Sequence, residues 1–470
     1  MSNTSENNAR ADLNGRNVLF IAYFYPPTAS TGVPGSMRTV KFIRHLSGGQ
    51  CHVLTTPPSV SDAKNALSHL ILPVNGEVIH RVKPLDVFKL LLGVRGTVKK
   101  LLGKQKSTSL VEAEPATATF KSTPNDSHAQ QQSTFQKLKD FIYNLCYFPD
   151  QAGPWILPAT RRGIDIVKKN NINAIFATGS PWSSLITGYR ISKATGIPLI
   201  VDFRDPWMNN PFHQSKGPVL DSWSKKFEQK VVQHASAVSL NTEPLLQEFL
   251  ERYPNETTSK FFVMPNGFDE SDFHDLQPEP TKADETTITL CHAGFLYGVR
   301  DPAALLDAIR ATNKVFQNEY VKKKLVLRQI GDVQLAYDLK QRFKDLIEDG
   351  SLIIESSRPY LECLKALKAA DVVVNIQPAT RSQIPSKLYD YLAINRPILS
   401  ITPPDGALGK LVTEKNIGRQ VDFDENDKLR AILVNLADSV EKPFGGYEAR
   451  VDFNVSTIAH ILSNCIVKLR

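Results

Sequence analysis

The sequence predicts an α/β protein with two Rossmann-like domains, each built on a doubly wound parallel sheet. Short apolar runs alternate with longer amphipathic runs, as strands and helices do in such a sheet. The alternation is interrupted by "DLQPEPTKADET" (275–286), a polar segment with prolines and acidic residues, and then restarts. This break indicates a linker at 276–286, between an N-terminal domain at 17–275 and a C-terminal domain at 287–450.

The N-terminal domain is expected to follow a disordered polar stretch at 1–16. "NVLFIAYF" (17–24) is interpreted as a buried strand, "SMRTVKFIRHL" (36–46) as the next helix and "CHVLTT" (51–56) as the second strand. The later segments with strand character are "AIFAT" (174–178), "PLIVDF" (198–203), "AVSLN" (237–241) and "FFVMPN" (261–266). Helical stretches separate several of them, which favours parallel pairing.

The C-terminal domain repeats this pattern. Its strand-like segments are "TITLCHAG" (287–294), "KLVLRQIG" (324–331), "SLIIE" (351–355), "DVVVNIQP" (371–378) and "PILSI" (397–401). The chain closes with "VDFNVSTIAHILSNCIVKL" (451–469), which has the spacing of an amphipathic helix, and we assign 451–470 to it.

One region of the N-terminal half departs from the alternation. Residues 107–134 are rich in Ser, Thr, Ala and Gln and are predicted to be a mobile insertion. The preceding segment, 85–106, has apolar residues at helical spacing with lysines and arginines between them. Such a helix can lie on an anionic membrane surface, or it can pack on its own domain with solvated lysines.

Composition narrows the classes of partner. The chain has 470 residues and a formal net charge of +8, which suits nucleotides, phospholipid surfaces or nucleic acid. We expect no nucleic-acid binding, because no RNA- or DNA-binding motif is recognisable. The five cysteines are scattered without a CxxC pair, which favours a reducing cytosol over a disulfide framework or a zinc site. No apolar run has the length of a membrane span.

Lys387 occupies an unusual position in "IPSKLYDYLAINRPILSI" (384–401). It lies in the first turn of a predicted helix, where the positive end of the helix dipole disfavours a cation. A bound anion would reverse this preference, because the free backbone N–H groups and the ammonium would then act together. The helix follows the strand at 371–378, and ligands of such sheets lie at the carboxyl ends of strands. The alternative is a solvated lysine.

Six phrases, in this order and spacing, resemble the GT-B glycosyltransferases of glycosyltransferase family 4, in particular bacterial surface-polysaccharide sugar transferases. They are "FYPPTASTGVPGSMR" (24–38), "FPDQAGPW" (148–155), "VDFRDPW" (201–207), "MPNGFDESDF" (264–273), "HAGFLYGVRDPAALLDAI" (292–309) and "IPSKLYDYLAINRPILSI" (384–401). The resemblance covers 17–465 apart from 107–134. It implies a terminal helix that crosses back to the first domain.

The resemblance also implies an activity. A sugar would pass from a nucleoside-diphosphate donor to a hydroxyl of a lipid-linked glycan, with retention and without a cofactor or metal ion. The enzyme would be cytoplasmic, at the inner face of the plasma membrane. "DFD" (422–424) imitates the metal-binding acids of other glycosyltransferases, but we interpret it as surface. The spacing of Gly32 and Gly35 lacks the dinucleotide fingerprint, which argues against a nicotinamide enzyme.

The resemblance places a donor site in the second domain. Gly294, Arg300, Ser386 and Lys387 would contact the diphosphate, where positive charge stabilises the leaving group. Asp390, on the helical face of Lys387, would accept hydrogen bonds from the ribose, or instead form an ion pair with that lysine.

Two positions depart from the family pattern. Ser382 stands where an acid is usual, and Phe295 stands where an arginine is usual. Either the donor sugar is held differently, or Arg381 and Lys387 compensate.

In the first domain, the resemblance singles out two further groups. Gly32, Gly35 and Arg38 would form a loop that contacts the acceptor or the donor phosphate, unless the glycines only shape a turn. Arg204 and Asp205, where many relatives have a histidine–aspartate pair, are the candidate catalytic residues, unless they form a structural ion-pair turn.

Two alternatives to a transferase stay open. A catalytically inactive scaffold of a polysaccharide assembly complex would be consistent with Ser382 and Phe295. A nucleotide-sugar epimerase would act on the donor without an acceptor.

Overall fold

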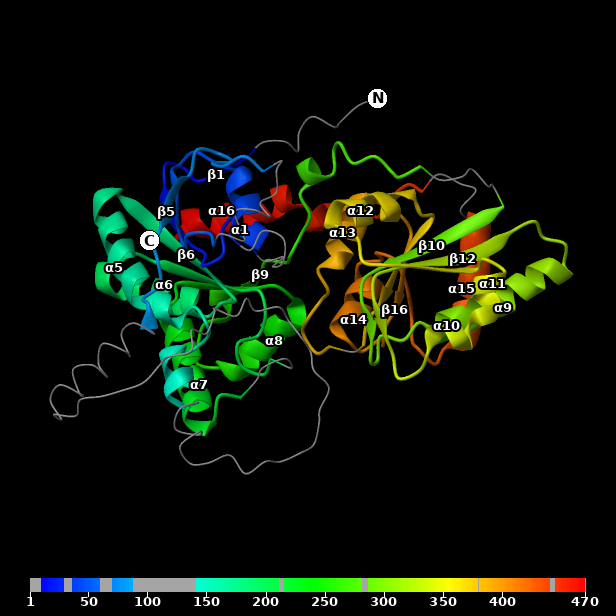
Figure 1. The fold of residues 1–470 in the computed structure, drawn as a ribbon. Coiled ribbons are helices and arrows are strands. Elements are labelled where there is room, and N and C mark those ends of the chain that lie inside the picture. The colour runs from blue at the N-terminus through cyan, green and yellow to red at the C-terminus, as the bar shows by residue number, and fades with distance from the viewer. Residues whose placement is uncertain are drawn as a thin grey trace, which may run out of the picture.

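The computed structural model describes residues 10–28, 36–59, 70–87, 141–210, 215–280, 286–378, 380–439 and 444–469. The chain forms two α/β domains, each with a parallel sheet covered by helices (Figure 1). This confirms the predicted fold class. The predicted insertion at 107–134, and all but three residues of 85–106, lie outside the described residues.

The N-terminal domain has a seven-stranded sheet with the order β5-β4-β2-β6-β7-β8-β9, and all neighbouring strands are parallel. The strands are β2 (Asn17–Ile21), β4 (Cys51–Thr55), β5 (Val78–Arg81), β6 (Ile172–Gly179), β7 (Leu199–Phe203), β8 (Ala237–Leu240) and β9 (Phe261–Val263). The helices are α1 (Ser36–Arg44), α5 (Ile156–Lys169), α6 (Ser183–Thr195), α7 (Pro218–His234) and α8 (Glu243–Arg252). The strands β4, β7 and β8 are buried along their whole length, as expected of a sheet covered on both faces.

The C-terminal domain has a six-stranded parallel sheet with the order β14-β12-β10-β15-β16-β17. Its strands are β10 (Thr287–Ala293), β12 (Lys324–Ile330), β14 (Leu352–Glu355), β15 (Val372–Ile376), β16 (Ile398–Ile401) and β17 (Arg419–Val421). Its helices are α9 (Ala303–Asn318), α10 (Leu339–Arg342), α11 (Lys344–Glu348), α12 (Tyr360–Ala369), α13 (Lys387–Ile394), α14 (Ala407–Glu414) and α15 (Asn426–Ser439). The strand order reverses between β10 and β15, which is the switch point where ligands bind in such sheets.

The last helix, α16 (Val455–Lys468), returns to the first domain, as predicted (Figure 1). Ile458, Leu462 and Ile466 are fully buried in the same core cluster as Phe20 and Phe42. The two chain segments that pass between the domains also pair with each other, because Phe268 bridges to Asn454. The apolar face of this C-terminal helix therefore stabilises the N-terminal domain, although the helix lies at the other end of the sequence.

The prediction that residues 1–16 are disordered is wrong for residues 10–16. There β1 (Ala11–Asp12) pairs with β3 (Leu46–Ser47), and Leu13 is fully buried. The reason is tertiary, since Ser463 of α16 donates a hydrogen bond to the carbonyl of Asp12. Residues 1–9 lie outside the described part of the chain.

The predicted linker at 276–286 begins on the C-terminal domain rather than between the domains. Leu276 is buried, and Glu279 forms ion pairs with Arg328 and Arg358 of that domain. Residues 281–285 lie outside the described residues. Among the helices that the structure describes, none combines the length and the apolar character needed to cross a membrane.

Candidate functional site

The switch point of the C-terminal sheet brings Lys387 and Gly294 together. Gly294 follows β10 with φ +154°, and Lys387 is the first residue of α13, after β15. A Cβ atom at Gly294 would lie 1.6 Å from the Lys387 Nζ atom. A side chain at position 294 would therefore have to displace this ammonium, which lies at the carboxyl ends of both strands. Ser386 is the N-cap of α13 and is exposed. Gly294, Ser386 and Lys387, three of the residues predicted to contact the diphosphate, are therefore neighbours.

Arg300 adds a second cation to this edge. Burial, and then the nearby guanidinium of Arg300, lower the pKa of the Lys387 ammonium to about 8. Across the described ranges, neither side chain forms an ion pair with a carboxylate, and Lys387 has no hydrogen-bond partner. Asp390 acts on Lys387 only through its charge, without a direct ion pair, so the two neighbouring cations still form an electrostatic environment that favours an anion.

His292, which the sequence analysis did not select, lies one residue before Ala293 and is buried beside these cations. Gln329 donates through Nε2 to the carbonyl of Gly294 at 2.7 Å, so its Oε1 must face His292 Nδ1, also at 2.7 Å. Nδ1 therefore carries the proton, and Nε2 is left as an acceptor. Burial and the charge of Lys387 lower the pKa of His292 to about 3, which keeps the ring neutral. The sequence does place this histidine at the end of a predicted strand, two residues before Gly294, and that position is the signal by which it could have been selected.

Phe295, the departure from the family pattern, belongs to a small aromatic cluster at the same edge. Its ring centroid is 4.8 Å from that of Tyr297 in β11 (Leu296–Tyr297), and the Arg300 guanidinium lies 5.0 Å from the Tyr297 ring. The backbone N–H of Arg300 also donates to the Tyr297 carbonyl at 2.9 Å. Tyr297 thus positions Arg300 by stacking and by a backbone turn.

Asp390 lies one helical turn after Lys387. The two side chains form no ion pair within the described residues, so the structure does not have the ion pair that was the alternative to a ribose contact. The Asp390 Oδ1 atom instead accepts a hydrogen bond of 2.8 Å from the Tyr360 hydroxyl of α12. Burial raises the pKa of Asp390 to about 6. A ribose contact would have to use its second oxygen, and this role stays a prediction.

Arg38 has a structural role that leaves no capacity for a ligand. Its Nε and Nη2 atoms donate to Asp202 at 3.0 Å each. The remaining donors bind the carbonyls of Met264 and Pro265 and the side chain of Asn266. A guanidinium has five N–H donors, and all five are used. The predicted ligand contact of Arg38 is therefore not supported, while Gly32 and Gly35 lie outside the described residues.

Arg204 and Asp205 face different partners. The buried Arg204 guanidinium donates to the carbonyls of Gly179 and Ser180 in its own domain. Asp205 instead accepts a 3.4 Å contact from Gln383 of the C-terminal domain, and burial raises the pKa of its carboxyl group. The two residues are not joined as an ion pair in the part of the chain described here, and their catalytic role stays a prediction.

A second contact joins the domains beside Asp205. The hydroxyl of Thr242, the N-cap of α8, donates to the Ser382 carbonyl at 2.7 Å. Ser382 is thus buried, with its backbone used as a bridge to the first domain. The loop at 380–386 therefore connects the Asp205 region to the start of α13.

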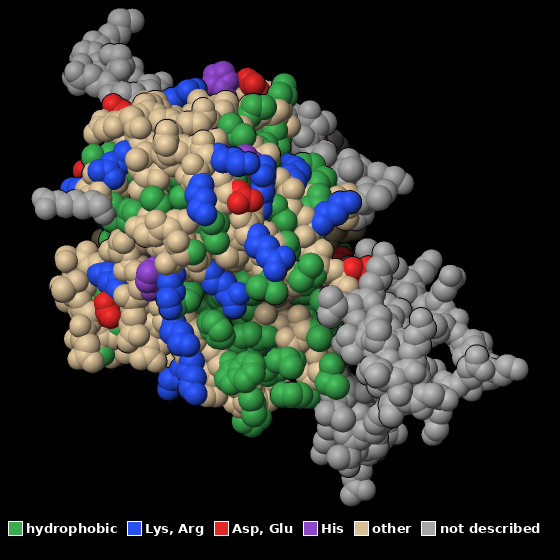
Figure 2. All heavy atoms as spheres, turned by 90° about the vertical axis from the view of Figure 1, so that its left-hand side faces the viewer, with side chains coloured by type: hydrophobic (Ala, Val, Ile, Leu, Met, Phe, Trp, Pro, Cys, Tyr) green, Lys and Arg blue, Asp and Glu red, His purple; other side chains and the backbone are tan. Residues whose placement is uncertain are grey.

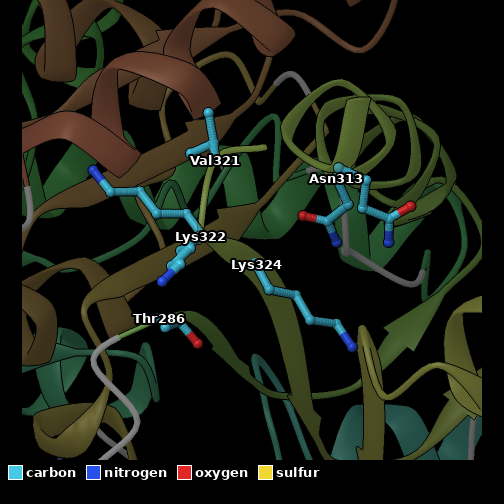
Figure 3. Close-up of a pocket in the computed structure, with 7 residues that line it drawn as sticks. Thr286, Asn313, Val321, Lys322 and Lys324 are labelled. Carbon is cyan, nitrogen blue, oxygen red and sulfur yellow. The ribbon is translucent and has the colours of Figure 1, made fainter. Parts of the chain in front are cut away.

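A hollow of about 330 Å³ lies elsewhere in the C-terminal domain (Figure 3). Thr286 and Lys324, which line it, stand at the starts of β10 and β12, whereas Gly294 follows the end of β10. Lys324 is already bound to the carbonyl of Asp349. Because ligands of these sheets bind at the carboxyl ends of strands, this hollow is not the candidate site.

Structural comparison agrees with the topology. The chain superposes on the N-terminal domain of Candida albicans trehalose-6-phosphate phosphatase with a TM-score of 0.53 and 11% identity, covering 97% of each chain. An E. coli structure described as trehalose-6-phosphate bound with UDP-2-fluoro glucose also gives 0.53 and 11%, over 97% of this chain and 100% of the other. Sucrose-phosphate synthase from Thermosynechococcus elongatus gives 0.50 and 12%, over 96% and 98%.

The fold is GT-B. The similarity extends over nearly the whole chain, so the arrangement of both domains is shared. No protein-family model matches the sequence, and no curated protein matches it significantly. At these identities the comparison establishes the GT-B fold alone.

Proposed function

We propose that this GT-B protein transfers a sugar from a nucleoside-diphosphate donor to a hydroxyl group of a glycan. The observation that carries the proposal is the ammonium of Lys387, which has no direct ion pair or hydrogen bond among the described residues and lies against Gly294, at the switch point and beside Arg300. Departure of the diphosphate builds negative charge, and two fixed cations would stabilise it. One of the structures with the same fold is described as bound with UDP-2-fluoro glucose, which supports this class of donor.

The finer assignment follows the family 4 resemblance. The acceptor would be a lipid-linked glycan of surface polysaccharide biosynthesis, and the reaction would proceed with retention and without a metal ion or cofactor. The protein would act in the cytoplasm, with 85–106 meeting the inner face of the membrane. Asp205 lies at the domain boundary, where Gln383 of the other domain contacts it, and its raised pKa suits proton exchange with the acceptor hydroxyl.

The first test is a thermal-shift screen against UDP, GDP, dTDP, CMP and their sugar conjugates. A ligand at 100 times its dissociation constant stabilises the native state by about 2.7 kcal/mol. We expect one nucleotide to shift the wild type and Lys322→Met, an exposed control lysine, but not Lys387→Met. A shift that persists in Lys387→Met would remove the ammonium from the site, and no shift with any nucleotide would favour the scaffold.

Turnover then separates the two enzymatic candidates. A transferase releases nucleoside diphosphate only when an acceptor is present, apart from slow hydrolysis. An epimerase changes the nucleotide sugar itself in the absence of acceptor. Conversion of the donor without acceptor would therefore replace the transferase proposal with the epimerase.

A further inference from the structure

The N-terminal domain exposes an unusual set of large apolar side chains away from the candidate site. They come from the helical segment 141–146 and from the start of α7, and they are Phe141, Ile142, Tyr143, Leu145, Val219 and Trp223. Tyr143 is 59% exposed and Trp223 is 41% exposed. Figure 2 shows hydrophobic side chains gathered on the lower part of the face formed by the left side of Figure 1. Apolar surface of this kind indicates an interaction site.

Aromatic contacts join the two segments into one surface. Phe148, just after the helical segment, contacts the Trp223 ring edge-to-face at 6.0 Å and the Phe227 ring at 5.7 Å. Lys216 also binds the carbonyls of Tyr147 and Pro149. The helical segment is thus fixed against α7, and its exposed side chains continue those of that helix.

The exposed charges of α7 are basic. Lys225, Lys226 and Lys230 are exposed, whereas the acids of the helix are occupied: Glu228 is buried in an ion pair with Arg252, and Asp221 binds Ser215. Val219, Trp223, Lys226 and Lys230 follow one stripe at i, i+4, i+7 and i+11, so apolar and basic side chains share a face. We call this surface, formed by 141–146 and α7, the aromatic–basic face.

We propose that the aromatic–basic face docks the protein on an anionic lipid bilayer. Tyr and Trp have amphipathic rings that suit the level of the lipid headgroups, and lysines next to them are attracted by acidic lipids. A protein partner would be expected to offer acidic side chains to these lysines. The bilayer accounts for both the aromatic and the basic parts without a shaped groove. The residues of this surface are different from 85–106, the segment named above for a membrane contact. Its test involves no nucleotide, so the result does not depend on whether the protein is a transferase.

Trp223 provides a specific reporter. The chain has four tryptophans, and Trp155, Trp182 and Trp207 are at most 9% exposed. A change in tryptophan emission on adding vesicles therefore reports Trp223. We expect a blue shift and protection from acrylamide quenching with phosphatidylcholine–phosphatidylserine vesicles, and neither effect with phosphatidylcholine alone. Raised ionic strength should reverse both effects.

Variants of the full chain locate the contact in vesicle co-sedimentation. Each lysine near an anionic surface contributes about 1 kcal/mol, so Lys226→Gln with Lys230→Gln, the two lysines of the stripe, should lower partitioning about 30-fold. Tyr143→Ser with Trp223→Ser should also release the protein. Tyr320→Ser and Lys322→Gln, at exposed positions of the C-terminal domain, should bind as the wild type does.

Three outcomes would overturn the proposal. The first is the absence of a lipid-dependent blue shift. The second is protection of Trp223 from acrylamide without vesicles, which would show that another part of the chain or a second copy covers the face. The third is unchanged sedimentation of both double variants, which would move membrane binding to another surface such as 85–106.

Discussion

Two basic side chains in this molecule have opposite surroundings. Arg38, in the N-terminal domain, is buried and gives all five N–H groups to protein acceptors, including both oxygens of Asp202. Lys387, in the C-terminal domain, is half-buried and binds no carboxylate among the described residues. Both were predicted to contact a ligand, and only Lys387 has the capacity to do so.

The difference shows how partners distinguish a structural cation from a binding one. A buried charge with complete hydrogen bonding holds segments together, and removing one member leaves the other uncompensated. A partly buried charge without a partner lowers the stability of the free protein, and an anionic ligand can recover that free energy. Each prediction below contrasts the two regions or tests the contact between them.

The largest effect is expected from Arg38→Met. It leaves Asp202 buried with only Thr178 and Ser239 as partners, so we expect a loss of about 3–5 kcal/mol in the free energy of unfolding. Urea denaturation measures this loss. The double variant with Asp202→Asn should recover part of it, because no charge then stays unpaired. A loss below about 1 kcal/mol would contradict the structural role, which rests on the buried pair.

Lys387→Met should lower turnover without lowering stability, in contrast to the loss of stability expected of Arg38→Met. We expect turnover to fall about 10²–10³-fold, as for loss of a group that stabilises developing charge. The free protein should not lose stability, and a gain of about 1–2 kcal/mol is expected because the lysine pKa is lowered to about 8 by burial. Steady-state kinetics and denaturation of the same samples measure both. A destabilised variant would show that Lys387, like Arg38, is structural.

Gly294→Ala should displace the ammonium without removing it. The new Cβ would overlap Lys387 Nζ, and the backbone at φ +154° disfavours any side chain, so we expect nucleotide affinity to fall about tenfold, or about 1.4 kcal/mol. Gly298→Ala is the matched control, since Gly298 also has a positive φ but open space around it. Isothermal titration calorimetry measures the affinity. Equal losses in both variants would attribute the effect to backbone strain alone.

Nucleotide affinity should depend on pH through Lys387. The ammonium has a pKa of about 8 in the free protein, and a bound anion stabilises the charged form, so the pKa rises in the complex. Affinity is then fully present below pH 8 and declines as the pH rises above it, by at most about tenfold per unit. Lys387→Met should lose this decline. A wild-type affinity that is flat from pH 7 to 9.5 would argue against contact with the ammonium.

An effect of similar size, on stability rather than on affinity, is expected at the bridge between the regions. Thr242→Val removes the donor to Ser382 and the cap of α8, which should cost about 1–2 kcal/mol of stability. Thr242→Ser keeps the hydroxyl and should be close to wild type. Thermal unfolding of both variants checks this, and equal melting temperatures would show that the bridge contributes nothing.

The sequence by itself determined the fold class and part of the candidate site. Alternating apolar and amphipathic runs are local patterns, and they were sufficient for two parallel sheets and a terminal helix. Lys387 could be selected because its place at a helix start, after a strand, is also a local feature. Strand ends at a switch point lie together in every sheet of this topology, so its proximity to Gly294 followed from the fold.

Only the tertiary structure decided which charged side chains are already paired. Arg38 is bound by residues more than 160 positions away, and Gln329 orients His292 from a different strand. The order of residues 10–16 likewise depends on α16, at the far end of the chain. Hydrogen-bond partners and burial arise from long-range contacts that leave no periodic signal in sequence, and it is these contacts that separate a structural charge from one free to bind a ligand.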